Sequence, residues 1–165
     1  MFSADSFVAV RLTPPNRRYL HGTIAVVPHG GGLAALAANL TMSQYLYGLG
    51  EMPSSWPREA LRAQATAGRS FAQYIMDHQN RATSFYDLDA GVRHQSYIGF
   101  EKEADPRWGP VWRAAVDDTV DRIVTYQGAA ALTAYSSSTG GRSESSAWVW
   151  GGTVPYLTSV DDPYD

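Results

Sequence analysis

The chain has 165 residues, 44% of them hydrophobic and including ten Tyr and five Trp, so it can bury a core without metal or disulfide staples. Its net charge of −3 and its single lysine, Lys102, leave no basic stripe, which argues against nucleic-acid binding. The absence of cysteine excludes a disulfide framework and a thiolate metal site. No apolar run reaches the roughly 18 residues of a membrane span, and residues 1–5 do not resemble the start of a signal peptide.

The N-terminal part predicts two strands and then a short helix. Residues 7–11 alternate valines with small or polar residues, and residues 23–27 are rich in β-branched residues. The two prolines and the asparagine of residues 14–16 separate these strands. Thr41 and Gln44 have the spacing of a capping box, which predicts that a short helix begins there.

A longer helix is predicted over residues 57–76, because Pro57 suits a first helical turn. Residues spaced three and four apart along it form an apolar stripe of mostly small side chains, so we expect this helix to be buried. The stripe consists of Ala60, Leu61, Gln64, Ala67, Gly68, Phe71 and Ile75. Gln64 is its polar exception, and a buried amide needs hydrogen-bond partners.

The remaining sequence predicts strands and loops around one short helix. The expected elements are strands at 85–88, 94–98, 121–126 and 130–137 and a helix at 108–116. Gln127-Gly128 lies between the last two strands and predicts a hairpin. We therefore expect an α+β fold, a single domain over residues 1–165 with a buried central helix packed against N- and C-terminal β-strands.

The link between the two first helices contains a candidate general acid, Glu51. Met52 and Trp56 flank it, and an apolar environment disfavours a charged carboxylate. If the preceding helix ends near Gly48, its negative pole also favours the protonated form. Carbohydrate-cleaving enzymes use a Glu in apolar surroundings as proton donor. The alternative is a solvated loop carboxylate.

A second candidate site is the Ser/Gly-rich loop of residues 136–141. It lacks the Gly-Lys-Ser/Thr ending of a phosphate-binding loop and the Gly-x-Ser-x-Gly elbow of serine hydrolases. It is either a plain turn or a saccharide contact, since sugars offer hydroxyls to polar groups and ring faces to aromatic side chains. The candidate contacts are Tyr135, Ser137, Ser138, Gly140, Gly141 and Trp148.

The histidines do not predict a metal site. His21, His29, His78 and His94 are scattered and form no ligand motif, so we expect surface or hydrogen-bonding roles and no bound metal.

Three stretches, in order, resemble the SpoIID/LytB family. The first reads Tyr-Leu-Tyr-Gly-Leu-Gly-Glu-Met-Pro over residues 45–53 and continues through residues 54–72. The second covers residues 134–144 and continues to residue 157, and residues 95–99 are a weaker match. Together they extend from about Leu40 to the end of the sequence, so most of the chain is covered.

This resemblance implies a peptidoglycan lytic transglycosylase that needs no cofactor. Such enzymes cleave the bond between N-acetylmuramic acid and N-acetylglucosamine without using water. Glu51 matches the family's catalytic acid, which protonates the glycosidic oxygen and then accepts the proton of the muramyl C6 hydroxyl as a 1,6-anhydro ring closes. Sporulation members have a zinc site that uses cysteine, and since this sequence has none, zinc is not expected here.

Two other functions remain open. LytB-like relatives enhance cell-wall amidases, so the chain is alternatively a non-catalytic module that binds glycan or an amidase. A hydrolytic glycosidase needs a second carboxylate, and the candidates are Asp87, Asp89 and Glu144.

Two residues of the longer helix have alternative roles. Gln64 either holds the Glu51 link by a hydrogen bond or contacts sugar. Arg69 lies about 140° further around the helix and is either a solvated charge or a substrate contact.

The resemblance also implies a location and partners. We expect an extracytoplasmic protein, at the bacterial cell wall or the outer face of the membrane, that binds peptidoglycan strands and, in the alternative, an amidase. The sequence is compatible with a domain excised from a longer exported protein.

Overall fold

The computed structural model describes residues 7–12 and 17–165. The break predicted at residues 14–16 and the assessment of residues 1–5 as a leader lie outside the described residues. The chain forms two compact units, residues 1–133 and residues 134–165, and each is described by itself. The single domain expected over the whole chain remains a prediction.

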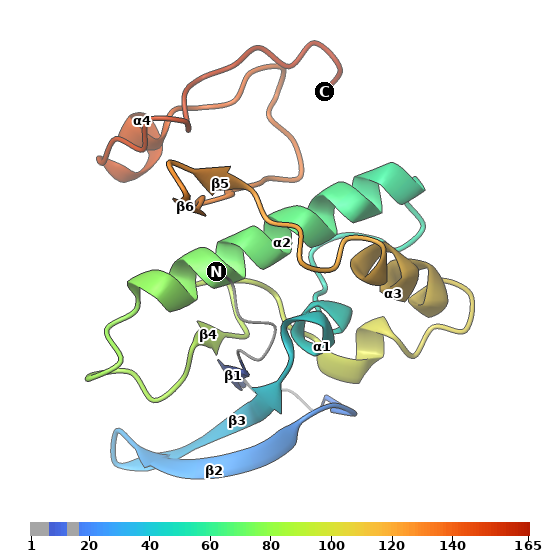
Figure 1. Ribbon diagram of the computed structural model, residues 1–165, viewed down its shortest axis with the longest axis vertical. Helices are drawn as coiled ribbons and strands as arrows, with labels where there is room; N and C mark the ends of the chain where they lie inside the picture. Colours follow the sequence, from blue (N-terminus) through green and yellow to red (C-terminus); the bar gives the residue numbers. More distant parts are fainter. Residues whose placement is uncertain (1–6, 13–16) are drawn as a thin grey trace. The chain divides into compact units, whose positions relative to one another are not determined.

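The first unit contains a four-stranded sheet in the order β2-β3-β1-β4. Strand β3 (Gly32–Leu40) pairs antiparallel with both β2 (Thr23–His29) and β1 (Val8–Arg11). The short strand β4 (Leu88–Asp89) is parallel to β1. Figure 1 shows β2 and β3 as a long twisted hairpin. The structure confirms strands near residues 7–11 and 23–27, whereas β3 was not predicted.

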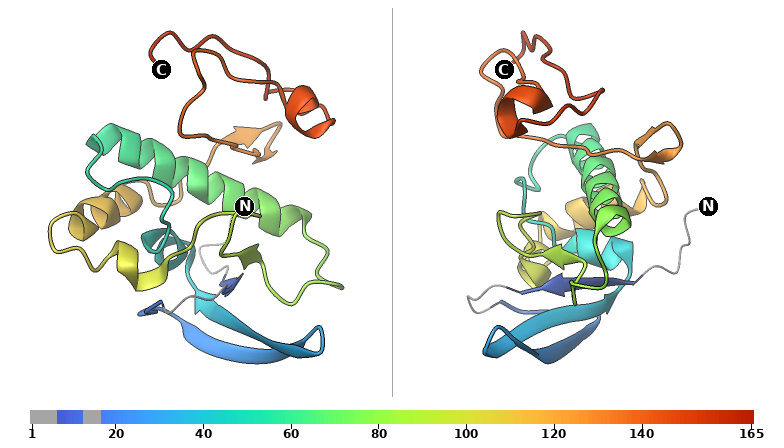
Figure 2. Two further views of the ribbon diagram at one scale, coloured as in Figure 1. Left: turned by 180° about the vertical axis from the view of Figure 1, so that it is seen from behind. Right: turned by 90° about the vertical axis from the view of Figure 1, so that its left-hand side faces the viewer.

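Two helices lie on the same face of this sheet, α1 (Met42–Tyr47) and α2 (Arg58–His78), as the side view of Figure 2 shows. The capping box of α1 is confirmed: the Gln44 N–H donates to the Thr41 hydroxyl at 3.2 Å, and the Thr41 N–H donates to the Gln44 side chain at 2.9 Å. Pro57 is the N-cap of α2 rather than part of its first turn. None of the helices in the described ranges is long and apolar enough to cross a membrane.

Helix α2 is buried as predicted, but the residues that form its buried face differ from those of the predicted stripe. That face consists of Leu61, Ala65, Gly68, Arg69, Ser70, Ala72 and Met76. Leu61 and Gly68 belong to the predicted stripe, whose other members are half-buried. Alanine occurs on several faces of this helix, so spacing alone did not identify the one that enters the core.

Gly68 lies where α2 meets the end of α1. A Cβ atom at this position would lie 2.9 Å from Leu49 Cδ2 and 3.3 Å from Leu46 Cδ2. We expect Gly68→Leu to displace these leucines and to lower the free energy of unfolding by about 1 to 3 kcal/mol, as measured by urea denaturation. Ala63→Leu, on the exposed side of the same helix, is the control. Equal stability of the two variants would contradict the packing described.

The C-terminal part of the first unit completes the predicted fold class. Strands β5 (Thr125–Tyr126) and β6 (Ala129–Ala130) form a hairpin around Gln127 and Gly128, whose φ angles of 50° and 83° suit a tight turn. Strand β6 packs against α2. Helix α3 (Gly109–Asp117), close to its predicted position, packs against α1 and α2. The fold is therefore α+β, with the central helix between N- and C-terminal strands.

Candidate active site

The Glu51 link pairs with a segment far along the sequence. Helix α1 ends at Gly48, as expected, and Leu49 then forms an antiparallel bridge with Tyr97. The Gly50 N–H donates to the Ser96 carbonyl at 2.7 Å, and the Ile98 N–H donates to the Gly48 carbonyl at 2.8 Å. Two of the stretches that carry the family resemblance are therefore in direct contact. The strand predicted at residues 94–98 contributes only this bridge.

Glycine permits this close approach. A Cβ atom at Gly48 would lie 2.4 Å from Tyr97 Cε2, and one at Gly50 would lie 2.9 Å from Ile98 Cγ2. Side chains at these two positions would clash with the side chains of Tyr97 and Ile98. The Tyr97 ring also stacks on Tyr45 of α1 with ring centroids 5.5 Å apart, so the pairing is anchored in the core.

The Glu51 side chain is exposed and has one defined contact. The Ser96 N–H donates to its Oε1 at 2.5 Å. Among the described residues Glu51 has no ion-pair partner. The carboxylate is thus held in a fixed orientation and remains open to a ligand.

The expectation of an apolar environment around this carboxylate is wrong, because the Glu51 side chain is exposed. Met52 is half-buried and packs against the hydrophobic core. Trp56 is 45% exposed. The apolar neighbours in sequence therefore do not enclose the carboxylate, because one of them belongs to the core and the other faces solvent.

Arg69 is buried rather than solvated, at 4% exposure. Its guanidinium donates to three backbone carbonyls, those of Val116 at 3.2 Å, Thr119 at 2.6 Å and Arg122 at 3.2 Å. Burial lowers the pKa of this guanidinium. These contacts give Arg69 a structural role at the end of α3 and leave its predicted substrate contact without support.

The structural hydrogen bond predicted for Gln64 is not formed by its amide nitrogen. Gln64 is half-buried on α2, and its Nε2 is shielded from solvent without a partner in the described part of the chain. A contact between Gln64 and sugar remains a prediction.

The candidate second carboxylates in the first unit are engaged by their own surroundings. Asp87 accepts the Ala9 N–H at 2.7 Å and pairs with Arg81 at 2.7 Å. Asp89 accepts the Gly91 N–H at 3.0 Å, and both carboxylates are buried. Within residues 7–12 and 17–165, the hydrogen bonds and ion pairs of both carboxylates go to residues other than Glu51, and Glu144 belongs to the second unit.

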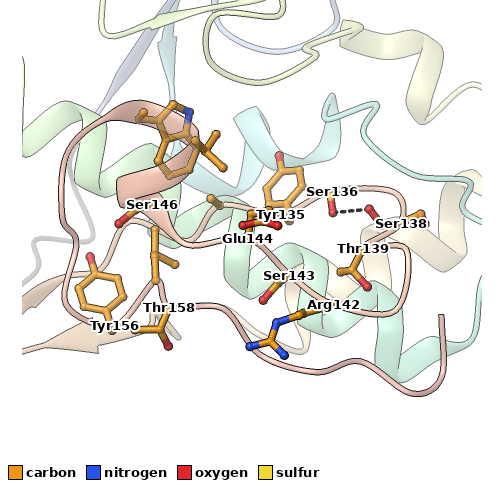
Figure 3. A pocket seen from close by; sticks show the side chains of 14 residues that line it. Tyr135, Ser136, Ser138, Thr139, Arg142, Ser143, Glu144, Ser146, Tyr156 and Thr158 are labelled. Atoms are coloured by element: carbon orange, nitrogen blue, oxygen red, sulfur yellow. Dashed lines mark hydrogen bonds between the residues drawn. The ribbon is translucent and has the colours of Figure 1, made fainter.

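The second unit contains a pocket of about 530 Å³ built from loops and the short helix α4 (Ser146–Trp150). Figure 3 shows hydroxyl, aromatic and charged side chains around it. The lining residues are Ala134, Tyr135, Ser136, Ser138, Thr139, Arg142, Ser143, Glu144, Ser146, Val149, Trp150, Tyr156, Leu157 and Thr158. This mixture of polar and apolar groups suits a saccharide.

Two of the predicted sugar contacts, Tyr135 and Ser138, line this pocket, whereas Trp148 does not. Trp148 is 80% exposed, and Trp150 contributes to the lining instead. Residues two apart on a helix point about 200° away from each other, so one of these tryptophans faces the pocket and the other faces away. The choice between the two tryptophans depends on where each lies around helix α4, and this helix was not predicted.

The Ser/Gly loop is organised around the carboxylate of Asp165. The Ser138 hydroxyl donates to it at 2.8 Å, the Gly140 N–H at 2.7 Å, and the Thr139 N–H also donates to it. Gly140 and Gly141 have φ angles of 65° and 90°, which favour glycine. Neither of these glycines nor Ser137 lines the pocket, so their sugar contacts remain predictions.

These donors lower the pKa of Asp165 from 3.8 to about 2. A depressed pKa means that the loop contact is complete above pH 3.8 and is lost as the pH falls through about 2. We expect the amide resonances of Thr139 and Gly140 to move together with this midpoint in an NMR titration. Asp165→Asn should remove the transition. A midpoint near 3.8 would contradict the contact.

The histidines have separate surroundings in the described structure. His21 Nε2 lies 2.8 Å from Glu103 Oε1, and His94 Nδ1 accepts the Asp89 N–H at 2.9 Å. Across residues 7–12 and 17–165, no three or more His, Asp or Glu side chains gather as a metal site would require.

Comparison with known proteins gives one family match. A family model described as "Stage II sporulation protein", SpoIID, matches residues 31–126. This range includes the Glu51 link, α2 and the paired segment around Ser96, and it ends before the second unit.

Three longer proteins are similar to this chain. An uncharacterized protein of Brachyspira hyodysenteriae is 34% identical over 143 residues, which cover 85% of this chain and 37% of that protein. The amidase enhancer of Bacillus subtilis is 36% identical over 115 residues, covering 70% of this chain and 14% of that protein. Stage II sporulation protein D of Bacillus subtilis is 29% identical over 138 residues, which cover 77% of this chain and 40% of that protein. The chain thus spans less than half of the length of each.

Proposed function

Because the chain belongs to the SpoIID family of stage II sporulation proteins, we propose that it acts on the bacterial cell wall as a lytic transglycosylase. Its substrate is the glycan strand of peptidoglycan, stripped of stem peptides. The observation that carries the proposal is the state of Glu51, an exposed carboxylate oriented by the Ser96 N–H and free of ion pairs in the described residues.

One carboxylate is sufficient for this chemistry. Glu51 in its protonated form donates a proton to the glycosidic oxygen, the bond to the muramyl C1 breaks, and the N-acetylglucosamine end leaves as an alcohol. The muramyl C6 hydroxyl then attacks C1 and returns its proton to Glu51, which closes a 1,6-anhydro ring. No water is consumed, and the acid is regenerated. A hydrolase would need a second carboxylate at a defined separation.

The exposure of Glu51 is compatible with this role if the glycan itself removes water. Sugar rings bound over the link would cover the carboxylate and favour its neutral form. The hydrogen bond from Ser96 fixes one carboxyl oxygen and leaves the other available for proton transfer.

The pocket of the second unit supports binding of the same class of ligand. Tyr135, Trp150 and Tyr156 offer aromatic surface, and Ser138 and Ser143 offer hydroxyls. We propose that this pocket holds glycan. Gln64 is a further sugar-contact candidate on the family resemblance, since its side chain is half-buried rather than fully buried.

A second candidate function is modulation of a cell-wall amidase without glycan cleavage. It is favoured by the similarity to the amidase enhancer, which covers 70% of this chain. In that case the partners are glycan and an amidase. Either function places the protein outside the cytoplasmic membrane, at the cell wall.

Purified glycan strands with and without stem peptides separate these functions. We expect the chain to cleave peptide-free strands, with products of discrete mass in a mass spectrum, and to leave peptide-bearing strands largely intact. Two results together would overturn the transglycosylase in favour of the enhancer. The chain would bind peptide-free strands without cleaving them, and it would speed the release of stem peptides from peptide-bearing strands by an added amidase.

A further inference from the structure

Lys102 is the single lysine of the chain, and it is buried at 8% exposure. It ends the short 3-10 helix η1 (Gly99–Lys102), which follows the segment that pairs with the Glu51 link. Its ammonium has no carboxylate partner in the described residues. Burial lowers the pKa of this group. A buried, unpaired cation is costly, so a specific contact is needed to explain it.

That contact is with the backbone of the Glu51 link. The Lys102 ammonium donates to the Met52 carbonyl, which belongs to the peptide bond between Met52 and Pro53, the second one after Glu51. The same ammonium lies 5.1 Å from the centre of the Trp112 ring, which provides a cation–π contact. Trp112 in turn donates its Nε1–H to the Leu46 carbonyl at 2.9 Å, near the end of α1.

The backbone around Glu51 is therefore fixed on both sides. On the N-terminal side, the Gly50 N–H donates to the Ser96 carbonyl. On the C-terminal side, Lys102 holds the Met52 carbonyl. The carboxylate between them accepts the Ser96 N–H at 2.5 Å. Without the Lys102 contact, the link would keep its hydrogen bonds at the Gly50 N–H and the Glu51 side chain and lose the one at the Met52 carbonyl.

We propose that Lys102 is a positioning residue for Glu51, which keeps the carboxylate on the Ser96 N–H by holding the Met52 carbonyl in place. This inference rests on the proposed function of Glu51. An apolar side chain would pack against Trp112 at a lower desolvation cost, but it could not hold a carbonyl. Because misplacement of a catalytic group by about 1 Å can reduce a rate by roughly 100-fold, such a contact affects turnover more than binding.

Lys102→Met tests the proposal, since it keeps the aliphatic stem and removes the donor. We expect kcat for glycan cleavage to fall by about tenfold to 100-fold, with KM changed less than about twofold. The matched control is Arg18→Met, which removes a cation paired with Glu101, the neighbour of Lys102, at 2.9 Å without touching Met52. This control should keep the kcat of the unmodified protein.

A rescue experiment separates positioning from simple packing. The chain has no cysteine, so Lys102→Cys introduces a single thiol that can be aminoethylated in denaturant before refolding. Aminoethylation restores an ammonium at nearly the original distance from the backbone. We expect the refolded aminoethylated variant to recover most of the lost kcat, and the refolded thiol form to remain impaired.

A readout without substrate distinguishes failure of this inference from failure of the proposed function. Hydrogen exchange of the Ser96 amide should accelerate by about tenfold in Lys102→Met and remain unchanged in Arg18→Met. Unchanged exchange and unchanged kcat in folded Lys102→Met would overturn the positioning role. If the unmodified protein cleaves no glycan, the proposed function fails, whereas accelerated Ser96 exchange would still support the contact.

Discussion

Glu51→Gln is expected to lower the rate of glycan cleavage by roughly a hundred- to ten-thousand-fold, because an amide cannot donate and recover the transferred proton. The substitution keeps the shape of the side chain, and its amide oxygen can still accept the Ser96 N–H. Fold and glycan binding should therefore remain intact. Turnover is measured on peptide-free strands, and binding is measured on the same strands by co-sedimentation.

The matched control for this substitution is Glu59→Gln. Glu59 is an exposed carboxylate on the first turn of α2, paired with Arg62 at 3.1 Å. We expect its removal to leave turnover unchanged. A folded Glu51→Gln protein that cleaves glycan at the rate of Glu59→Gln would contradict the role of Glu51 as the acid.

Arg69→Met is expected to lower the free energy of unfolding by about 3 to 4 kcal/mol. The substitution removes the buried guanidinium from the carbonyls of Val116 and Thr119, which keep the N–H donors of Thr119 and Arg122 but lose the charged donor. A hydrogen bond to a charged group contributes about 1.5 to 3 kcal/mol, and several are lost together here. Urea denaturation monitored by tryptophan fluorescence gives the stability.

Arg58→Met is the control for loss of a positive charge. Arg58 is exposed and pairs with Asp118 at 2.5 Å on the surface, where solvent screens the pair, so its loss should change the free energy of unfolding much less. Equal stability of the two variants would show that Arg69 is not the structural residue described. A loss of glycan binding by Arg69→Met without a loss of stability would return it to the substrate site.

Elements with strong local signals were predictable from the sequence. The capping box of Thr41 and Gln44 begins α1 in the structure, and Gln127-Gly128 forms the turn of a hairpin. Strand β3 was missed because four of its nine residues are alanine, which has a low preference for strands. Its conformation is imposed by pairing with β1 and β2 on either side, a tertiary effect that local sequence does not carry.

The candidate site was predictable only where local sequence determines it. Glu51 and the end of α1 at Gly48 follow from local sequence. The contact of Glu51 with Ser96 joins residues 45 positions apart, and no periodicity indicates it. The burial of Arg69 was not predicted, because helical spacing gives its direction, whereas its burial depends on α3 packing over it. Lys102 carried a signal as the single lysine, but its contact with Met52 again depends on the fold.

The most direct test of the central claim, cleavage by one carboxylate without water, is digestion of peptide-free strands in water enriched in oxygen-18. Mass spectrometry then reads both the mass and the label of each new terminus. We predict products that end in 1,6-anhydromuramic acid and carry no oxygen-18, because the muramyl C6 hydroxyl is the nucleophile. Oxygen-18 in new reducing ends, produced by a preparation free of other muramidases, would contradict this account and would show that a second group activates water.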